Sequence, residues 1–190
     1  MGPKSMISSA ARAYAPLSPD HRRAIAELMW TAREIALRIP SARRVMTAQI
    51  KHLAFYWTTS AFCPVRQVVI PDAIKFNVCF MHHTLAAHRL LGPADSDAQG
   101  VVHEHAVPRS VLATYVVDEA SSIQDVVDTF HKHCVAVLVT EDEDKELNAG
   151  GFRDRMPAEW TWAGDPLARY VALRIRVLAP TNDAPCTCRS

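Results

Sequence analysis

An apolar run at residues 134–139 most constrains how this chain of 190 residues can fold. The run has the sequence CVAVLV, and such continuous apolar character is typical of a short strand that is buried on both faces. Thr140 follows at once, and its hydroxyl can cap a helix over the acidic residues 141–148, which Gly150 and Gly151 then end. A buried strand that leads directly into a capped acidic helix predicts a mixed fold of the α+β class.

The segment before this run predicts a further strand and two helices. Residues 101–107 are expected to form a short strand, and residues 109–117 a helix. Ser122 can cap another helix, whose apolar face comprises Ile123, Val126, Val127 and Phe130. The second half therefore has the expected order strand, helical insertion, strand, helix, with a last helix over residues 165–173.

Two amphipathic helices are predicted near the N-terminus. Ser18, Pro19 and Asp20 combine a capping hydroxyl, a proline at the first helical position and an acid, and the helix is expected to end before Pro40. Ser41 can then cap a second helix. The expected apolar faces comprise Ile25, Leu28, Met29, Ala32, Ile35, Ala36 and Ile39, then Val45, Met46, Ile50, Leu53, Ala54 and Trp57. The outer side of the second helix carries Arg43, Arg44 and Lys51.

The middle of the chain predicts a strand at residues 65–70 and a helix at residues 73–91, with His82 and His83 on the helix surface. A polar loop at residues 93–100 is the expected internal boundary. The predicted organisation is then a flexible lead-in, a basic helical region, an α+β core and a flexible tail, over residues 1–17, 18–98, 99–178 and 179–190.

Charge is distributed unevenly along the chain. Residues 1–100 carry 12 Lys or Arg and 6 Asp or Glu, whereas residues 101–190 carry 9 Lys or Arg and 14 Asp or Glu. This asymmetry fits a polyanion-binding front half beside an acidic half that attracts metal ions. Two solvated faces without such roles would give the same totals.

Neither a membrane protein nor a disulfide framework is indicated. No run approaches ~18 consecutive apolar residues, and the start lacks the pattern of a signal peptide, so we expect a cytoplasmic protein. Five cysteines are present, and this odd number favours reduced thiols. Cys186 and Cys188 form a C-x-C pair without a second pair at zinc-ribbon spacing.

The segment with the most chemical content is residues 101–110, VVHEHAVPRS. Glu104 lies next to His105 at the expected end of a strand. A carboxylate can hold a hard cation such as Mg²⁺ through oxygen, and an imidazole can take a proton from water. Because neighbouring residues of a strand point to opposite faces, both groups can serve one site only if the strand end twists.

Residues 104–108, EHAVP, resemble the Asp/Glu-His-x-x-Pro signature that opens the ββα-metal site of HNH nucleases. The following residues 109–112 are similar to the corresponding stretch in the HNH domain of RNA-guided DNA nucleases. In that family a second strand and a helix follow, and residues 135–148 have this order. The resemblance covers roughly residues 101–157, under a third of the chain.

The resemblance implies a set of roles. His105 would be the general base, and Glu104 the first metal ligand. The second ligand would come from the acidic helix, as Asp144 or, one turn further on, Asn148, although the family more often has His or Asn there. Arg153 would stabilise the transition-state charge. The residues expected to contact nucleic acid are Arg43, Arg44, Lys51, Arg109 and Arg155.

The leading interpretation is therefore a DNA endonuclease that uses Mg²⁺ or Mn²⁺, in restriction, phage defence or mobile-element biology. Its substrate would be double-stranded DNA, and a symmetric cutter would be expected to form a homodimer. One alternative is a non-catalytic nuclease-like module that binds nucleic acid or protein. Another is a Zn²⁺-dependent hydrolase or regulator that uses His103, His105, His131, His133 and Cys134. Trp160 and Trp162 are expected to cover the core.

Overall fold

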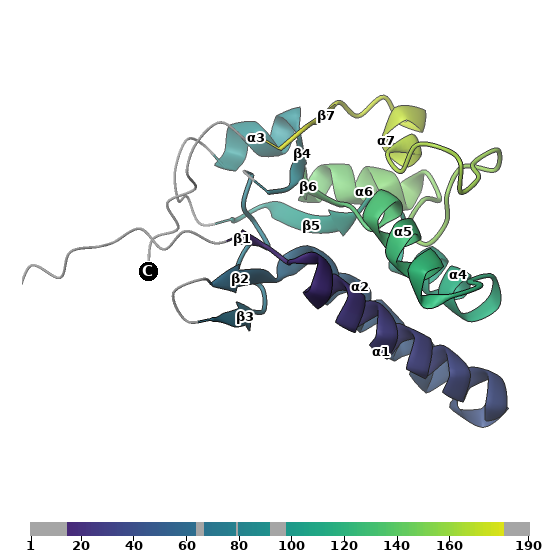
Figure 1. Cartoon of the computed structure of the whole chain (residues 1–190). Helices are drawn as coiled ribbons and strands as arrows, with labels where there is room; N and C mark the ends of the chain where they lie inside the picture. The colour runs from purple at the N-terminus through teal and green to yellow at the C-terminus, as the bar shows by residue number, and fades with distance from the viewer. Residues whose placement is uncertain (1–14, 64–66, 79, 92–97, 181–190) are drawn as a thin grey trace, which may run out of the picture.

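The computed structural model describes residues 15–63, 67–78, 80–91 and 98–180 (Figure 1). Most of the expected lead-in and tail, together with the C-terminal cysteine pair, lies outside these residues. Within them the protein has a mixed α+β architecture, as the sequence predicts. None of the described helices is long and apolar enough to cross a bilayer.

The N-terminal helical hairpin begins as expected. Helix α1 spans Pro19–Arg38, and Ser18 accepts a hydrogen bond from the backbone N–H of His21 at its start. The predicted cap at Ser41 is wrong, because this residue lies in a 3₁₀ helix, η1 (Pro40–Ala42), that joins the two long helices. Helix α2, Arg43–Thr59, follows without a side-chain cap.

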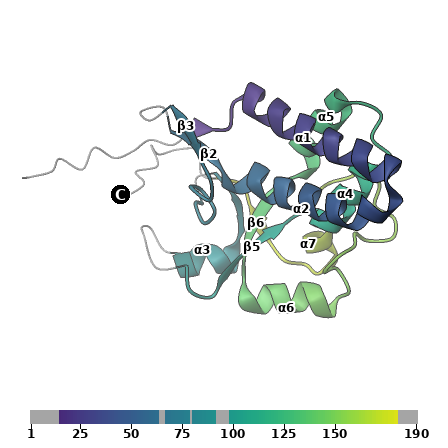
Figure 2. The ribbon, with the colours of Figure 1, turned by 90° about the horizontal axis from the view of Figure 1, so that it is seen from below.

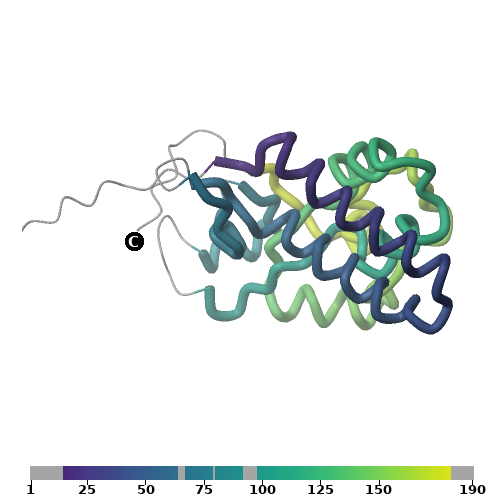
Figure 3. The backbone as a smooth tube through the Cα atoms, turned by 60° about the horizontal axis from the view of Figure 1, so that its bottom comes forward, coloured from purple at the N-terminus to yellow at the C-terminus, as the bar shows by residue number. Residues whose placement is uncertain are grey.

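The hairpin and the helical insertion share one apolar core. Helices α4 (Arg109–Asp118) and α5 (Ile123–His133) pack against α1 and α2 (Figure 2, Figure 3). The largest buried side chains of this core include Met29, Ile50, Trp57, Leu112, Val116 and Phe130. Because α4 and α5 cover only part of the hairpin, the predicted apolar faces are wrong at four positions. The exposed residues are Leu28, Ile35, Ile39 and Val45.

Beside these helices lies a sheet that, among the described residues, has the strand order β5-β6-β4-β7. The strands are Val101–His105 (β5), Ala136–Thr140 (β6), His82–Thr84 (β4) and Val177–Leu178 (β7). Strands β5 and β6 are antiparallel, with His105 opposite Ala136, whereas β4 runs parallel to β6 and antiparallel to β7.

The helix predicted over residues 73–91 is wrong in its first part. In the described part of this segment, only α3, Leu85–Leu91, is helical, and His83 is fully buried in β4 instead of lying on a helix surface. Pairing of β4 with β6 explains this difference, because a non-local ladder overrides a local helical pattern. The expected boundary near residue 98 is also crossed, since β4 belongs to the same sheet as β5 and β6.

A smaller antiparallel sheet lies at the end of the hairpin. Among the described residues it contains β1 (Ala15–Pro16), β2 (Ala61–Cys63) and β3 (Val68–Ile70). Strand β3 falls within the predicted strand at residues 65–70, whose first two residues lie outside the described ranges. The predicted helical region 18–98 therefore also contains strands.

The acidic helix forms where the sequence predicts it. Helix α6, Glu141–Ala149, begins with a capping box in which Thr140 and Glu143 exchange side-chain and backbone hydrogen bonds. It packs against β5 and β6 through Leu147, which is 1% exposed. Helix α7, Ala168–Ala172, is shorter than the predicted segment 165–173 and places Tyr170 in the same core.

Candidate active site

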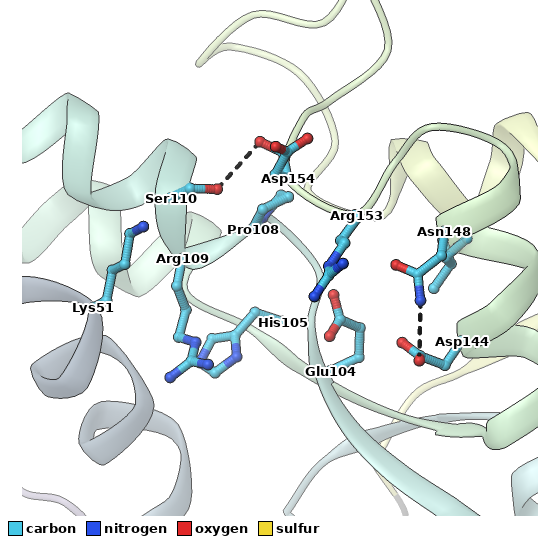
Figure 4. Close-up of a pocket in the computed structure, with 11 residues that line it drawn as sticks. Lys51, Glu104, His105, Pro108, Arg109, Ser110, Asp144, Asn148, Arg153 and Asp154 are labelled. Carbon is cyan, nitrogen blue, oxygen red and sulfur yellow. Dashed lines mark hydrogen bonds between the residues drawn. The ribbon is translucent and has the colours of Figure 1, made fainter. Parts of the chain in front are cut away.

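A cavity of about 600 Å³ opens where β5 ends. Strand β5, helix α2, the start of α4, helix α6 and the segment after α6 all contribute to its wall (Figure 4). Seven of the ten residues singled out from the sequence line it: Lys51, Glu104, His105, Arg109, Asp144, Asn148 and Arg153. The other three, Arg43, Arg44 and Arg155, do not.

Glu104 is held by an arginine that sequence reasoning missed. The side chain of Arg169 is completely buried, and its Nη2 donates to Glu104 Oε1 at 2.9 Å. The same guanidinium donates to the backbone carbonyl oxygens of His105, Ala106 and Phe152. A single arginine in a short helix carries no local signal of such a role, so only the folded chain reveals it.

The environment of Glu104 suits it to bind a cation. Burial raises the pKa of this carboxyl group, Arg169 lowers it, and the negative charge of Asp144 raises it again. Among the described residues, no side chain or N–H donates a hydrogen bond to the second oxygen, Oε2. A cation between Glu104 and Asp144 would neutralise their mutual repulsion and the charge that burial disfavours.

Asp144 and Asn148 lie one turn apart on α6 and face the same cavity (Figure 4). Asn148 Nδ2 donates to Asp144 Oδ2 at 3.2 Å. This bond directs the amide nitrogen away from any cation and leaves the amide oxygen available, together with the other oxygen of Asp144. Helix α6 therefore places two further oxygen atoms, one from Asp144 and one from Asn148, at the wall of the cavity that Glu104 also lines.

His105 is almost completely buried, with an exposure of 4%. Its Nε2 lies 3.3 Å from the carbonyl oxygen of Ala54 and 3.2 Å from Oγ1 of Thr58. Thr58 in turn donates its hydroxyl hydrogen to the carbonyl of Phe55. Because both neighbours of Nε2 can then only accept, the hydrogen of the neutral ring belongs on Nε2 and the lone pair on Nδ1.

Burial also determines the charge of His105. It lowers the pKa of this ring well below its usual value, and His103 and Arg109 lower it further. The ring is consequently neutral at physiological pH and has a lone pair that can take a proton. Although Glu104 and His105 are neighbours in β5, both line the cavity, as a shared site requires.

Three positive side chains surround these groups. Lys51 from α2, Arg109 from the start of α4 and Arg153 line the cavity, and Figure 4 shows Arg153 extending toward Glu104. The guanidinium of Arg109 also lies 5.5 Å from the centre of the Phe55 ring. These cations give the rim the charge that a phosphate group would need.

The remaining predicted nucleic-acid contacts lie elsewhere. Arg43 pairs with Asp118 at 2.5 Å, so this acid compensates its charge. Arg44 is exposed on α2, and Arg155 lies 3.7 Å from Asp154. The basic hairpin face therefore contributes only Lys51 to the cavity.

The four histidines expected to form a zinc site do not all gather. The rings of His103 and His105 have their centres 5.1 Å apart, but His131 and His133 have other partners. His131 Nδ1 accepts a hydrogen bond from Arg22, and His133 Nε2 donates to the carbonyl of Trp162. They point apart because residues two positions apart on a helix lie on different faces. Among the described residues, no group of three or more His, Cys, Asp or Glu could hold a metal ion. The two tryptophans, Trp160 and Trp162, pack against the helical core as predicted.

No protein-family model, curated protein or solved structure matches this chain. The resemblance to HNH nucleases therefore depends on the motif at Glu104 and His105 and on the order of the elements around the cavity.

Proposed function

We propose that this protein is a metal-dependent endonuclease that hydrolyses the phosphodiester bonds of DNA. The observation that carries the proposal is the shared cavity, which is lined by one imidazole, three carboxylates, one amide and three cations. The chain order β5, helical insertion, β6 and α6 supports a ββα-metal core of the HNH type. Cleavage of a phosphodiester needs a base, a divalent cation and positive charge around the phosphate.

The donor set fits Mg²⁺ or Mn²⁺. Glu104, Asp144 and Asn148 offer oxygen atoms only, which suit hard cations that keep several waters and also bind substrate phosphate. Two carboxylates with one amide also suit such a site better than zinc, which prefers nitrogen and sulfur. A bound cation would polarise the scissile phosphate and acidify a nearby water.

His105 would accept the proton of the attacking water at Nδ1. Ala54 and Thr58 keep the ring hydrogen on Nε2, so the imidazole needs no tautomer change before the reaction. Its low pKa makes His105 a weak base, which suits it to an acidified water and lets it release the proton readily. The N-terminal hairpin thus supports the base directly, through α2.

Lys51, Arg109 and Arg153 would bind the phosphate backbone and the charge that develops on the scissile phosphate. Double-stranded DNA as the substrate, a homodimeric form and a role in restriction or phage defence stay predictions from the resemblance. A zinc-dependent activity is not proposed, because the described residues contain no group of three or more His, Cys, Asp or Glu that could hold the ion.

The proposal is tested with supercoiled plasmid DNA in Mg²⁺ or Mn²⁺. We expect cleavage by the unmodified protein and a loss of at least about 100-fold in Asp144→Asn. Glu146→Gln is the matched control, since this exposed residue of the same helix lies outside the cavity and should cleave normally. The absence of cleavage of DNA or RNA with either ion, or equal rates for both variants, would overturn the proposal.

A further inference from the structure

A second cavity, of about 240 Å³, is lined in part by Thr58. Its wall combines the start of α1, the end of α2, β4 and β6, and it shares no lining residue with the first cavity. Thr58 is its link to the candidate active site, because its Oγ1 contacts His105. Two polar residues of this wall, Arg22 and Ser60, have buried atoms without a hydrogen-bond partner among the described residues.

Arg22 gives this cavity an uncompensated positive charge. Its Nη1 donates to neutral His131 at 2.8 Å, and its guanidinium carbon lies 5.4 Å from the centre of the Trp57 ring. Nε is buried and has no hydrogen-bond partner in the described part of the chain. Within the same residues, no carboxylate lies within ion-pair distance of Arg22, and burial lowers its pKa.

Ser60 is a second, independent sign of an incomplete site. This residue is 1% exposed, lines the cavity, and its hydroxyl has no hydrogen-bond partner among the residues that the structure describes. Buried polar groups normally have partners, and an unpaired buried charge is costly. An anion in the cavity would satisfy both the serine hydroxyl and the arginine.

The rest of the wall determines what kind of anion fits. Among the described residues, none that lines the cavity is acidic, whereas the apolar side chains in its wall include Leu17, Trp57, Ile74, Phe80 and Met81. A molecule that is apolar apart from its charged group can therefore bury its body against these side chains. A fully hydrated inorganic ion would leave this apolar surface unused.

We propose that this second cavity binds a small organic anion. Its carboxylate or phosphate group contacts Arg22 and Ser60, and its apolar body packs beside Trp57 and Met81. The proposal does not depend on nuclease activity, since neither the residues nor the test involve cleavage.

Isothermal titration calorimetry on the full chain tests this proposal with benzoate, phenyl phosphate, acetate and inorganic phosphate. We expect saturable binding of benzoate or phenyl phosphate, and the tighter of the two identifies the charged group. Acetate and inorganic phosphate should bind at least about tenfold more weakly, because they lack the apolar body.

Arg22→Met should weaken the tighter probe by about tenfold or more, because it removes a charge-assisted hydrogen bond. Arg23→Met is the matched control, since Arg23 is exposed and pairs with Glu27 instead. Ser60→Ala provides a second variant that is small enough for its buried position, in case Arg22→Met does not fold. Saturable binding by none of the four probes, or unchanged binding in Arg22→Met and Ser60→Ala, would overturn the proposal.

Discussion

Arg169 donates from Nη2 to Glu104 Oε1 at 2.9 Å, with its own side chain completely buried. This contact joins α7, near the C-terminal end of the described chain, to the strand that carries the proposed metal ligand. Within the described residues, the second carboxylate oxygen of Glu104 accepts no hydrogen bond from the protein. Arg169 is thus a positioning residue, which acts on the site through Glu104.

Replacing Arg169 by methionine should destabilise the fold strongly. The change leaves the half-buried Glu104 carboxylate unpaired and removes the donor to three backbone carbonyls. Breaking a buried pair in this way costs about 3–5 kcal/mol. Urea unfolding of Arg169→Met measures the loss, and the double variant with Glu104→Gln should recover part of it. A loss below about 1 kcal/mol would show that this pair is not important for stability.

Replacing Thr58 by valine should slow cleavage and leave substrate binding nearly unchanged. The hydroxyl is one of two acceptors for Nε2–H of His105, and its loss frees the ring to reorient. Removing such a supporting partner typically costs about 10–100-fold in activity. The measurement is kcat and KM on a DNA substrate.

Thr59→Val is the control for this experiment. Its hydroxyl also donates to the carbonyl of Phe55 but makes no described contact with His105. Equal loss of kcat in the two variants would mean that Thr58 acts only through the stability of α2.

Acid should destabilise the protein through His103. Burial lowers the pKa of this ring to about 4, with Lys75 and Arg109 adding to the effect. Between about pH 6.5 and pH 4, His103 is therefore protonated in the unfolded chain and neutral in the folded state. Stability is fully present above the unfolded pKa and is lost as the pH falls through this window.

The loss attributable to His103 between pH 7 and pH 5 should be about 1–2 kcal/mol. Burial lowers the pKa values of His82, His83, His131 and His133 as well, so the comparison must be differential. Denaturant unfolding of His103→Gln should show a smaller loss over this range than the unmodified protein. Identical pH dependence in the two proteins would contradict the assignment.

The sequence predicts well what short-range physics determines. Ser18 and Thr140 cap helices because a hydroxyl and the backbone a few residues later suffice to form the bond. Glu104 and Asp144 meet because a strand, a returning strand and a helix follow one another in a fixed order, even with a helical insertion between the strands.

Features that depend on contacts between residues far apart in the sequence could not be predicted in the same way. The pairing of β4 with β6 buries His83, although its local pattern is helical. Arg169 reaches Glu104 across 65 positions in the sequence. Ala54 and Thr58 contact His105 from a helix for which the sequence predicted a core face and a DNA-binding face, but no contact with the base. The zinc hypothesis has the same limit, since spacing does not show which imidazoles meet.

Plasmid cleavage by His105→Ala, with and without added imidazole, tests the central claim most directly. We expect that this variant, in Mg²⁺, loses cleavage while His52→Ala, a change on the exposed face of α2, retains it. Imidazole should restore part of the lost rate, because it can enter the space that the side chain leaves and take the proton in its place. Cleavage by His105→Ala at the rate of the unmodified protein would contradict the assignment of His105 as the base.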